Sequence, residues 1–323
     1  MSISRAIVWI DDNPGRKTTA DDLGAKFVDV RNKDLAQKVD ELIKGPQPSL
    51  VILDHILDKT ATTNPLFQRG STIAEAIKEH WPACPVIGVT NAGNDKDIDI
   101  RTRRTYDALY QFVNFGNYLH RIKSISRDFA VVTKAKAKKT RDIVKLLKPP
   151  EDEIERLVAA LPDDLKKEPF HDASLASHLF RWVGHLIDRP GFLYNSLWSA
   201  TFLGLNELGF KKVIECFEKG KYVGVFAWDD DPRWWSSRLS ELLYKLCKPE
   251  IGELSWHVGR RLRGIKKEHY SRCYVCDEEF PDTVAYLDAV SDECRAMHLR
   301  CTMLHPRYKR ELYFEDIRMM QGK

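Results

Sequence analysis

Two groups of side chains in this 323-residue chain have the types and the spacing that chemistry requires. The first group is acidic, and its members follow short apolar runs. Within Arg5 to Pro14, Asp11 and Asp12 come directly after the apolar run Ala6 to Ile10, and Asp54 ends the run Leu50 to Asp54. Two adjacent carboxylates repel each other unless a cation or a proton lies between them. If the two runs are neighbouring parallel strands, the acids meet at one sheet edge and offer the oxygen ligands that Mg²⁺ prefers. The sequence therefore predicts a magnesium site at this edge.

A third apolar run, Pro85 to Thr90, ends in a hydroxyl group. The order of these four positions along residues 1–130 resembles the receiver domain of response regulators, the phosphoproteins of bacterial two-component signalling. The resemblance implies that Asp11 and Asp12 hold Mg²⁺. It also implies that Asp54 accepts a phosphoryl group from a sensor kinase and that Thr90 responds to its presence.

The chain departs from the receiver pattern at one position. Receivers carry a lysine at the end of the fifth strand, whereas the matching run here, Tyr110 to Phe115, offers Asn114. An amide supplies no charge, so it would stabilise a phosphoryl group less well than a lysine does. Two interpretations follow: Asp54 is phosphorylated, or the domain is a degenerate receiver that serves as a docking platform.

The second group has the spacing of a structural zinc site near the carboxyl end. Its members are Cys273, Cys276, His298 and Cys301. A two-residue gap lets a tight knuckle direct two ligands at one ion, and a second pair completes a tetrahedron. Residues 268–310 resemble zinc-knuckle and treble-clef modules in this spacing only. Cys294 and His305 are substitute ligands, since a helix would put them on one face with His298 and Cys301.

The pattern of apolar residues predicts the elements that position both groups. Strands alternate with helices over residues 1–130, so we expect an α/β fold with a doubly wound, parallel, five-stranded sheet. From Asn117 the pattern is helical as far as Pro149, and residues 131–150 form a basic helical linker that is a candidate homodimer contact. Residues 151–323 are expected to form a mostly α-helical second domain that includes the zinc module. No family is recognised in the middle of the chain.

Charge and hydropathy narrow the class of protein. The formal net charge of +4 is too small to indicate nucleic-acid binding by itself. A local basic cluster is a candidate nucleic-acid contact, although a solvated helix face is the simpler and favoured explanation: Arg260, Arg261, Arg263, Lys266 and Lys267. No run reaches the roughly 20 apolar residues that span a bilayer, and no secretory signal is recognised. The sequence therefore predicts a cytoplasmic protein without a membrane partner.

Two functions remain open from the sequence. The favoured hypothesis is a regulatory protein in which the receiver-like domain controls a zinc-containing output domain that contacts protein or nucleic acid. The alternative is an effector enzyme such as a nuclease, with Asp229 to Asp231 as candidate acids and His178 and His185 as candidate bases. No spacing joins those residues, and the three acids are more simply explained as helix-capping charges.

Overall fold

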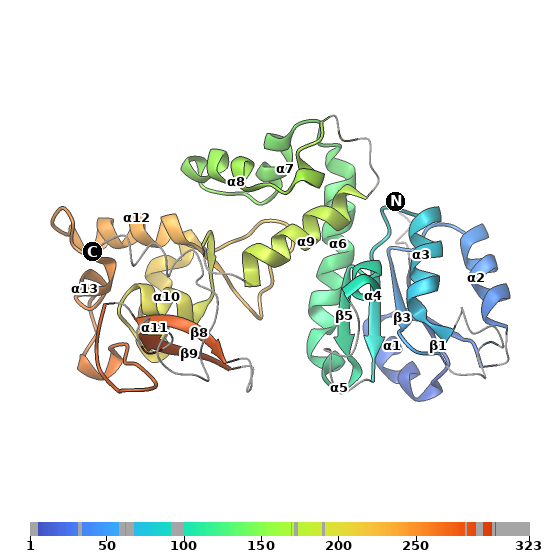
Figure 1. Cartoon of the computed structure of the whole chain (residues 1–323), viewed down its shortest axis with the longest axis horizontal. Helices are drawn as coiled ribbons and strands as arrows, with labels where there is room; N and C mark the ends of the chain where they lie inside the picture. The colour runs from blue at the N-terminus through green and yellow to red at the C-terminus, as the bar shows by residue number, and fades with distance from the viewer. Residues whose placement is uncertain are drawn as a thin grey trace. The chain divides into compact units, whose positions relative to one another are not determined.

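The apolar runs of the N-terminal region form one parallel sheet in the computed structural model (Figure 1). Its strands are β1 (Ile7–Asp11), β2 (Ala25–Asp29), β3 (Leu50–Asp54), β4 (Val86–Thr90) and β5 (Ala108–Gln111). The strand order is β2-β1-β3-β4-β5, and every neighbouring pair is parallel. Ile10 of β1 pairs with Leu53 of β3, so Asp11 and Asp54 end their strands at the same edge. The predicted doubly wound sheet is confirmed.

The structure describes residues 6–31, 34–57, 62, 68–91, 100–168, 170, 174–188, 191–281, 283–288, 293–298 and 301. The chain divides into two units. The first contains Met1–Ile143 and Leu161–Arg181, and the second contains Val144–Ala160 and Trp182–Lys323.

Helices connect the strands and cover both faces of the sheet. They are α1 (Lys17–Leu23), α2 (Leu35–Lys44), α3 (Gly70–His80), α4 (Ile100–Thr105), α5 (Phe112–Phe115) and α6 (Leu119–Ala135). Leu35 of α2 and Ile73 of α3 pack with Val8 and Val51 in one buried cluster. Successive side chains of a strand point to opposite faces, so Trp9 lies on the other face, where its ring is 5.0 Å from that of Phe115. Burial on both faces explains why these strands are apolar without alternation.

The fifth strand is shorter than predicted. β5 ends at Gln111, which pairs with Thr90, and the predicted continuation through Phe115 is the short helix α5. The helix places Phe115 in a fully buried position against Trp9. Asn114 is exposed on α5 and does not end the strand, so the prediction for that residue was wrong.

The long helix expected from Asn117 to Pro149 is interrupted. α6 ends at Ala135, Lys136 has a left-handed backbone with φ of 48°, and α7 (Thr140–Leu146) begins after the break. Lysines at positions 134, 136, 138 and 139 repel one another, which opposes a continuous helix.

The described part of the chain after α7 contains more helices than strands. Its helices are α8 (Ile154–Ala160), α9 (Leu175–Asp188), α10 (Ser196–Phe202), α11 (Glu207–Val213), α12 (Ser236–Cys247) and α13 (Ser255–Gly259). Two antiparallel pairs of strands complete it: β6 (Leu193–Tyr194) with β7 (Trp234–Trp235), and β8 (Thr283–Asp288) with β9 (Glu293–His298). Within the described residues, no helix has the length and apolar character needed to cross a bilayer.

Two segments of the second unit differ from what their own sequence patterns predict, which is a helix from Ser196 to Leu208 and a strand from Tyr222 to Ala227. The helix expected from Ser196 to Leu208 is split into α10 and α11, because Gly204 takes a left-handed φ of 68° and Asn206 caps α11 by accepting from Gly209 N at 2.8 Å. The strand expected from Tyr222 to Ala227 is a turn in which Ala227 N donates to Gly224 O. A Cβ at Gly224 would lie 2.4 Å from Leu147 O, so this turn depends on a glycine.

Candidate functional site

The carboxyl edge of the sheet gathers three acids that are distant in sequence. Carboxylate oxygens of Asp11, Asp12 and Asp54 lie within 4.8 Å of one another. Asp11 is fully buried and Asp54 nearly so, whereas Asp12 is half-buried. Thr90 is buried at the end of β4, the strand next to β3. The structure thus brings the acids to one edge, as their positions after parallel strands require.

Asp11 is held by a dense set of hydrogen bonds. Its Oδ1 accepts from Asn13 N at 2.8 Å, and its Oδ2 accepts from Trp9 Nε1 at 3.0 Å. Oδ2 also accepts from Arg16 Nη1 at 2.7 Å. Both oxygens of this buried carboxylate therefore have donors from the protein itself.

Arg16 is the residue of the pocket that the sequence analysis missed. Its Nη1 lies 2.7 Å from Asp11 Oδ2 and 3.0 Å from Asp54 Oδ1, and its side chain is only 1% exposed. A single 3₁₀ turn, Pro14–Arg16, brings it there, with the Asn13 side chain accepting from Gly15 N at 2.9 Å. The Asn13-Pro14 turn signal directly after the acid pair was the clue, since a tight turn returns the chain toward the strand end.

The charges of the pocket are only partly balanced. Burial and the neighbouring Asp11 raise the pKa of Asp54 to about 7, although Arg16 acts to lower it. Burial acts to lower the pKa of Arg16, but Asp54 and Asp11 outweigh it and the pKa is raised. The arginine therefore stays charged, while one guanidinium does not fully offset the carboxylates around it.

The three acids have the ligand type and spacing of a Mg²⁺ site, but the space between two of them is taken. Mg²⁺ binds oxygen at roughly 2.0–2.1 Å. An ion at that distance from both Asp11 and Asp54 would overlap Nη1 of Arg16, which contacts the same two carboxylates. The pocket in this arrangement does not fit Mg²⁺ and Arg16 together.

The backbone next to Asp54 is closely packed. Gly70 N donates to His55 O at 2.9 Å, and a Cβ at Gly70 would lie 2.1 Å from Asp54 O. The Tyr106 hydroxyl lies 3.2 Å from His55 Nδ1. These contacts fix the start of α3 against the end of β3 and hold the Asp54 backbone in place.

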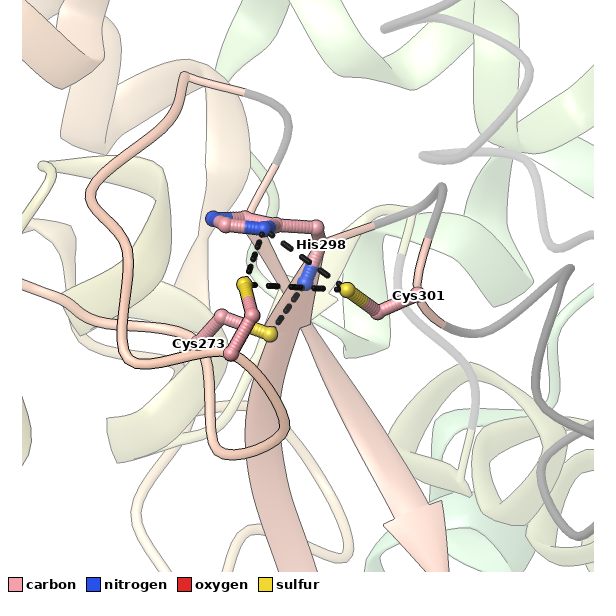
Figure 2. A group of neighbouring side chains, drawn as sticks. Cys273, His298 and Cys301 are labelled. Atoms are coloured by element: carbon pink, nitrogen blue, oxygen red, sulfur yellow. Dashed lines mark hydrogen bonds between the residues drawn. The ribbon is translucent and has the colours of Figure 1, made fainter.

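The second cluster lies in the C-terminal unit, where Cys273, His298 and Cys301 point toward one another (Figure 2). The sulfurs of Cys276 and Cys301 are 3.8 Å apart, and His298 Nδ1 lies 3.2 Å from Cys276 Sγ and 3.9 Å from Cys301 Sγ. Tetrahedral zinc with Zn–S of about 2.3 Å requires S···S separations of about 3.8 Å and S···N separations of about 3.6 Å. The donor set and its spacing therefore fit one zinc ion, with Nδ1 as the histidine ligand.

A knuckle and a strand position these ligands. Asp277 N donates to Cys273 O at 2.9 Å, closing the turn between the first two cysteines, and Asp277 itself has a positive φ of 57°. Tyr274 N donates to Ala296 O at 2.8 Å, which joins the knuckle to β9. His298 ends β9, so the helical face proposed for the substitute ligands was wrong. The side chains of Cys294 and His305 lie outside the described residues.

The pKa values of two of the thiols are shifted in opposite directions. Burial acts to raise the pKa of Cys273, but hydrogen bonds from backbone N–H groups, including that of His298, outweigh it and lower the pKa. Burial raises the pKa of Cys301 to about 12. The backbone donors of the knuckle thus favour the thiolate form of Cys273, which is the form that binds metal.

Two members of the basic cluster make ion pairs within the second unit, and the other three are exposed. Arg260 lies over the ring of Trp256 at 3.3 Å and over that of Tyr270 at 4.2 Å, and it pairs with Glu279 at 3.0 Å. Arg261 pairs with Glu253 at 2.8 Å. Both arginines therefore take part in contacts within the unit. The remaining members are exposed, and their role in nucleic-acid binding stays a prediction: Arg263, Lys266 and Lys267.

The candidate catalytic residues of the alternative hypothesis are not gathered in the part of the chain that the structure describes. Asp231 pairs with Arg233. Adjacent tryptophans can stack on bases when they are exposed, but Trp234 and Trp235 are buried in β7. Among the described residues, clusters of three or more potential metal ligands occur at the acidic edge and the Cys/His site.

The strand order and the acidic edge define the first unit as a receiver-like domain. Solved structures similar to this chain include the Mn²⁺-bound response regulator Rcp1, with 17% identity over 37% of this chain and 92% of that one, and a TM-score of 0.29. A response regulator from Burkholderia pseudomallei with a phosphorylated aspartate is 14% identical over 56% and 92%, with a TM-score of 0.28. The response regulator RcsB of Salmonella typhimurium is 13% identical over 57% and 100%, with a TM-score of 0.27.

The strand order of the sheet and the three acids at its carboxyl edge are the features that make the first unit receiver-like. No protein-family model matches the chain. No curated protein matches it either.

Proposed function

We propose that this chain is a regulatory protein in which the receiver-like domain receives its signal by docking, and the zinc-containing unit delivers the output through contact with a protein. The observation that carries the proposal is the buried acid pocket at the end of β1 and β3, closed by Arg16. A pocket that is filled by a side chain of the chain itself favours docking over phosphoryl transfer at Asp54.

The output is proposed to be a contact rather than a turnover. Three cysteines and one histidine form a closed set of four ligands, which is typical of structural zinc, because catalytic zinc keeps a position for water or substrate. Such a site stabilises the fold of a small module.

A protein partner is favoured over nucleic acid by the surface of the second unit. Arg260 and Arg261 are used in ion pairs within the unit. Large apolar side chains are exposed nearby in sequence, at Tyr244, Ile251 and Leu254. Apolar side chains contribute to the core of protein–protein interfaces, whereas contacts with nucleic acid depend mainly on basic side chains that are available to phosphates.

The docking mode is tested by treating the full chain with Mg²⁺ and a small acyl phosphate, followed by intact-mass measurement. We expect the mass to remain that of the unmodified chain. A gain of one phosphoryl group that Asp54→Asn abolishes would show that Asp54 is an acceptor and would overturn docking as the input.

The partner is tested by affinity capture of the full chain with and without nuclease treatment of the extract. We expect a protein to be retained after nuclease treatment. Loss of all bound material with the nucleic acid would replace the protein contact with a nucleic-acid contact.

A further inference from the structure

We propose that Arg16 is the resident cation of the acidic pocket: it occupies the place of a divalent ion, and Mg²⁺ binds only if Arg16 is displaced. The inference deepens the proposed role of this pocket and rests on that role for its significance. Its geometry and its test concern the pocket alone.

One nitrogen of Arg16 bridges the two strands that carry the acids. Nη1 of Arg16 contacts a carboxylate oxygen of β1 and a carboxylate oxygen of β3, at 2.7 Å and 3.0 Å. A cation that bridges two carboxylates removes the repulsion between them, which is what a metal ion would do at this edge. The guanidinium and the ion would therefore serve the same purpose at the same place.

The Asp11 carboxylate already accepts hydrogen bonds from the protein on both oxygens. Each of its oxygens already accepts from the protein, from Asn13 N and from Trp9 Nε1 in addition to Arg16. Mg²⁺ gives up its water reluctantly and usually retains several water ligands. A fully buried carboxylate with protein donors on both oxygens is a poor ligand for such an ion.

The guanidinium of Arg16 is buried beneath an aromatic ring. Phe112 stacks on Arg16, with the ring centroid 4.6 Å from the guanidinium carbon. Nε and Nη2 of Arg16 are buried and have no hydrogen-bond partner among the described residues. Burying these donors is unfavourable. The carboxylates are thus what retains Arg16, and a cation that replaced it there would return the donors to water.

The 3₁₀ turn after β1 positions the Arg16 backbone so that its side chain reaches the acids. Arg16 lies five residues after Asp11 and is held by the 3₁₀ turn that Pro14 begins, with Arg16 N donating to Asn13 O at 3.1 Å. Little chain entropy is lost when its side chain reaches back, because the turn already fixes the backbone.

The inference is tested by titrating the zinc-loaded full chain, and its Arg16→Gln variant, with MgCl₂ and separately with MnCl₂. Binding is followed by calorimetry and by the melting temperature. Gln is neutral and cannot balance the carboxylates, so we expect the variant to bind either ion at least about tenfold more tightly than the wild type does. Its melting temperature should be lower without metal and should rise as metal is added.

Arg238→Gln is the matched control. Arg238 also pairs with an acid, Glu241, but this half-exposed pair lies on α12, in the second unit. This variant should bind metal as the wild type does. Equal metal affinity in the wild type and Arg16→Gln would overturn the inference.

Arg16→Lys covers the case in which Arg16→Gln fails to fold without metal. A lysine retains the charge, so this variant should fold and bind Mg²⁺ no more than a few-fold more tightly than the wild type, whereas a gain like that expected for Gln would contradict the charge argument. The phosphoryl and partner experiments above test the proposed function separately, since neither depends on the affinity of the Arg16 variants for metal.

Discussion

At the scale of single residues, the acid pocket combines local and distant contributions. Asp11 ends β1 and Arg16 lies only five residues further along, in the turn that follows, whereas Asp54 reaches them from another strand. The raised pKa of Asp54 is a consequence of that meeting, because burial and Asp11 both act against its charge.

The raised pKa predicts a decrease of stability with increasing pH. Asp54 has a pKa of about 7 in the folded chain against an ordinary 3.8, so below about pH 4 it is protonated in both states and imposes no penalty. As the pH rises toward 7, the unfolded chain ionises first, and the free energy of unfolding falls by roughly 2–4 kcal/mol through this group.

The comparison that isolates this effect is wild type against Asp54→Asn, unfolded by urea in metal-free buffer at about pH 5 and about pH 8. The stability difference between the two proteins should shift in favour of the variant at the higher pH. A difference that does not change with pH would show that Asp54 is ionised throughout.

At the scale of elements, the pocket depends on the junction between β3 and α3. Gly70 begins α3, and a methyl group there would meet the carbonyl oxygen of Asp54 at 2.1 Å. The absence of a side chain at this position is therefore a condition for the strand and the helix to approach as they do.

Gly70→Ala should destabilise the first unit by about 1–3 kcal/mol or more, because the closest atom is backbone and cannot move aside easily. Thermal unfolding measures the change. Gly116→Ala is the control, since Gly116 has an ordinary helical φ of −54° and open space around it. If both variants melt together with the wild type, the packing at this junction is looser than described.

In the second unit, the candidate zinc site depends on the junction between the knuckle and β9. Tyr274 N donates a hydrogen bond to Ala296 O, which joins the knuckle that carries Cys273 and Cys276 to the strand that ends in His298. A metal that holds both parts contributes directly to the folding of the module.

Cys276→Ser should abolish zinc retention, with about one zinc per chain in the wild type and little in the variant. Elemental analysis after dialysis measures this. Cys216→Ser is the matched control, because Cys216 is exposed and lies outside the cluster. Retention of zinc by the Cys276 variant would mean that the ligand set has been assigned incorrectly.

At the scale of the whole molecule, each of the two units contains its own cluster of potential metal ligands. Their chemistry differs: carboxylates and an arginine in the first unit, thiols and an imidazole in the second. Sites that share no residues usually contribute additively to stability.

Removal of zinc by a chelator should therefore increase hydrogen exchange in β8, β9 and the Cys273 to Cys276 knuckle, and leave the amides of β1 and β3 unchanged. Hydrogen–deuterium exchange with mass spectrometry resolves the two regions. Equal loss of protection in β1 and β3 would show that the two units unfold together.

Much of the fold follows from the sequence because its signals are local. Buried parallel strands are continuous apolar runs, so β1, β3 and β4 could be predicted from a few residues each. The spacing of Cys273 and Cys276 likewise indicates a knuckle, because a two-residue gap determines where the sulfurs can point.

Other features depend on contacts between residues far apart in sequence. β5 ends at Gln111 and the next four residues form a helix with Phe115 buried against Trp9, although the aromatic run itself has strand character. Trp234 and Trp235 could have been exposed stacking residues, and their burial is decided by the packing of Trp234 against Phe210 at 5.1 Å and of Trp235 against Tyr222 at 5.5 Å.

The sequence by itself thus determined the buried strands β1, β3 and β4, the acids at the ends of β1 and β3, and the spacing of the cysteine knuckle, since each is a property of the chain over a few neighbouring residues. Only the tertiary structure decided that Arg16 fills the acid pocket. That outcome requires β1 and β3 to lie side by side, so that one buried guanidinium can reach carboxylates of both strands.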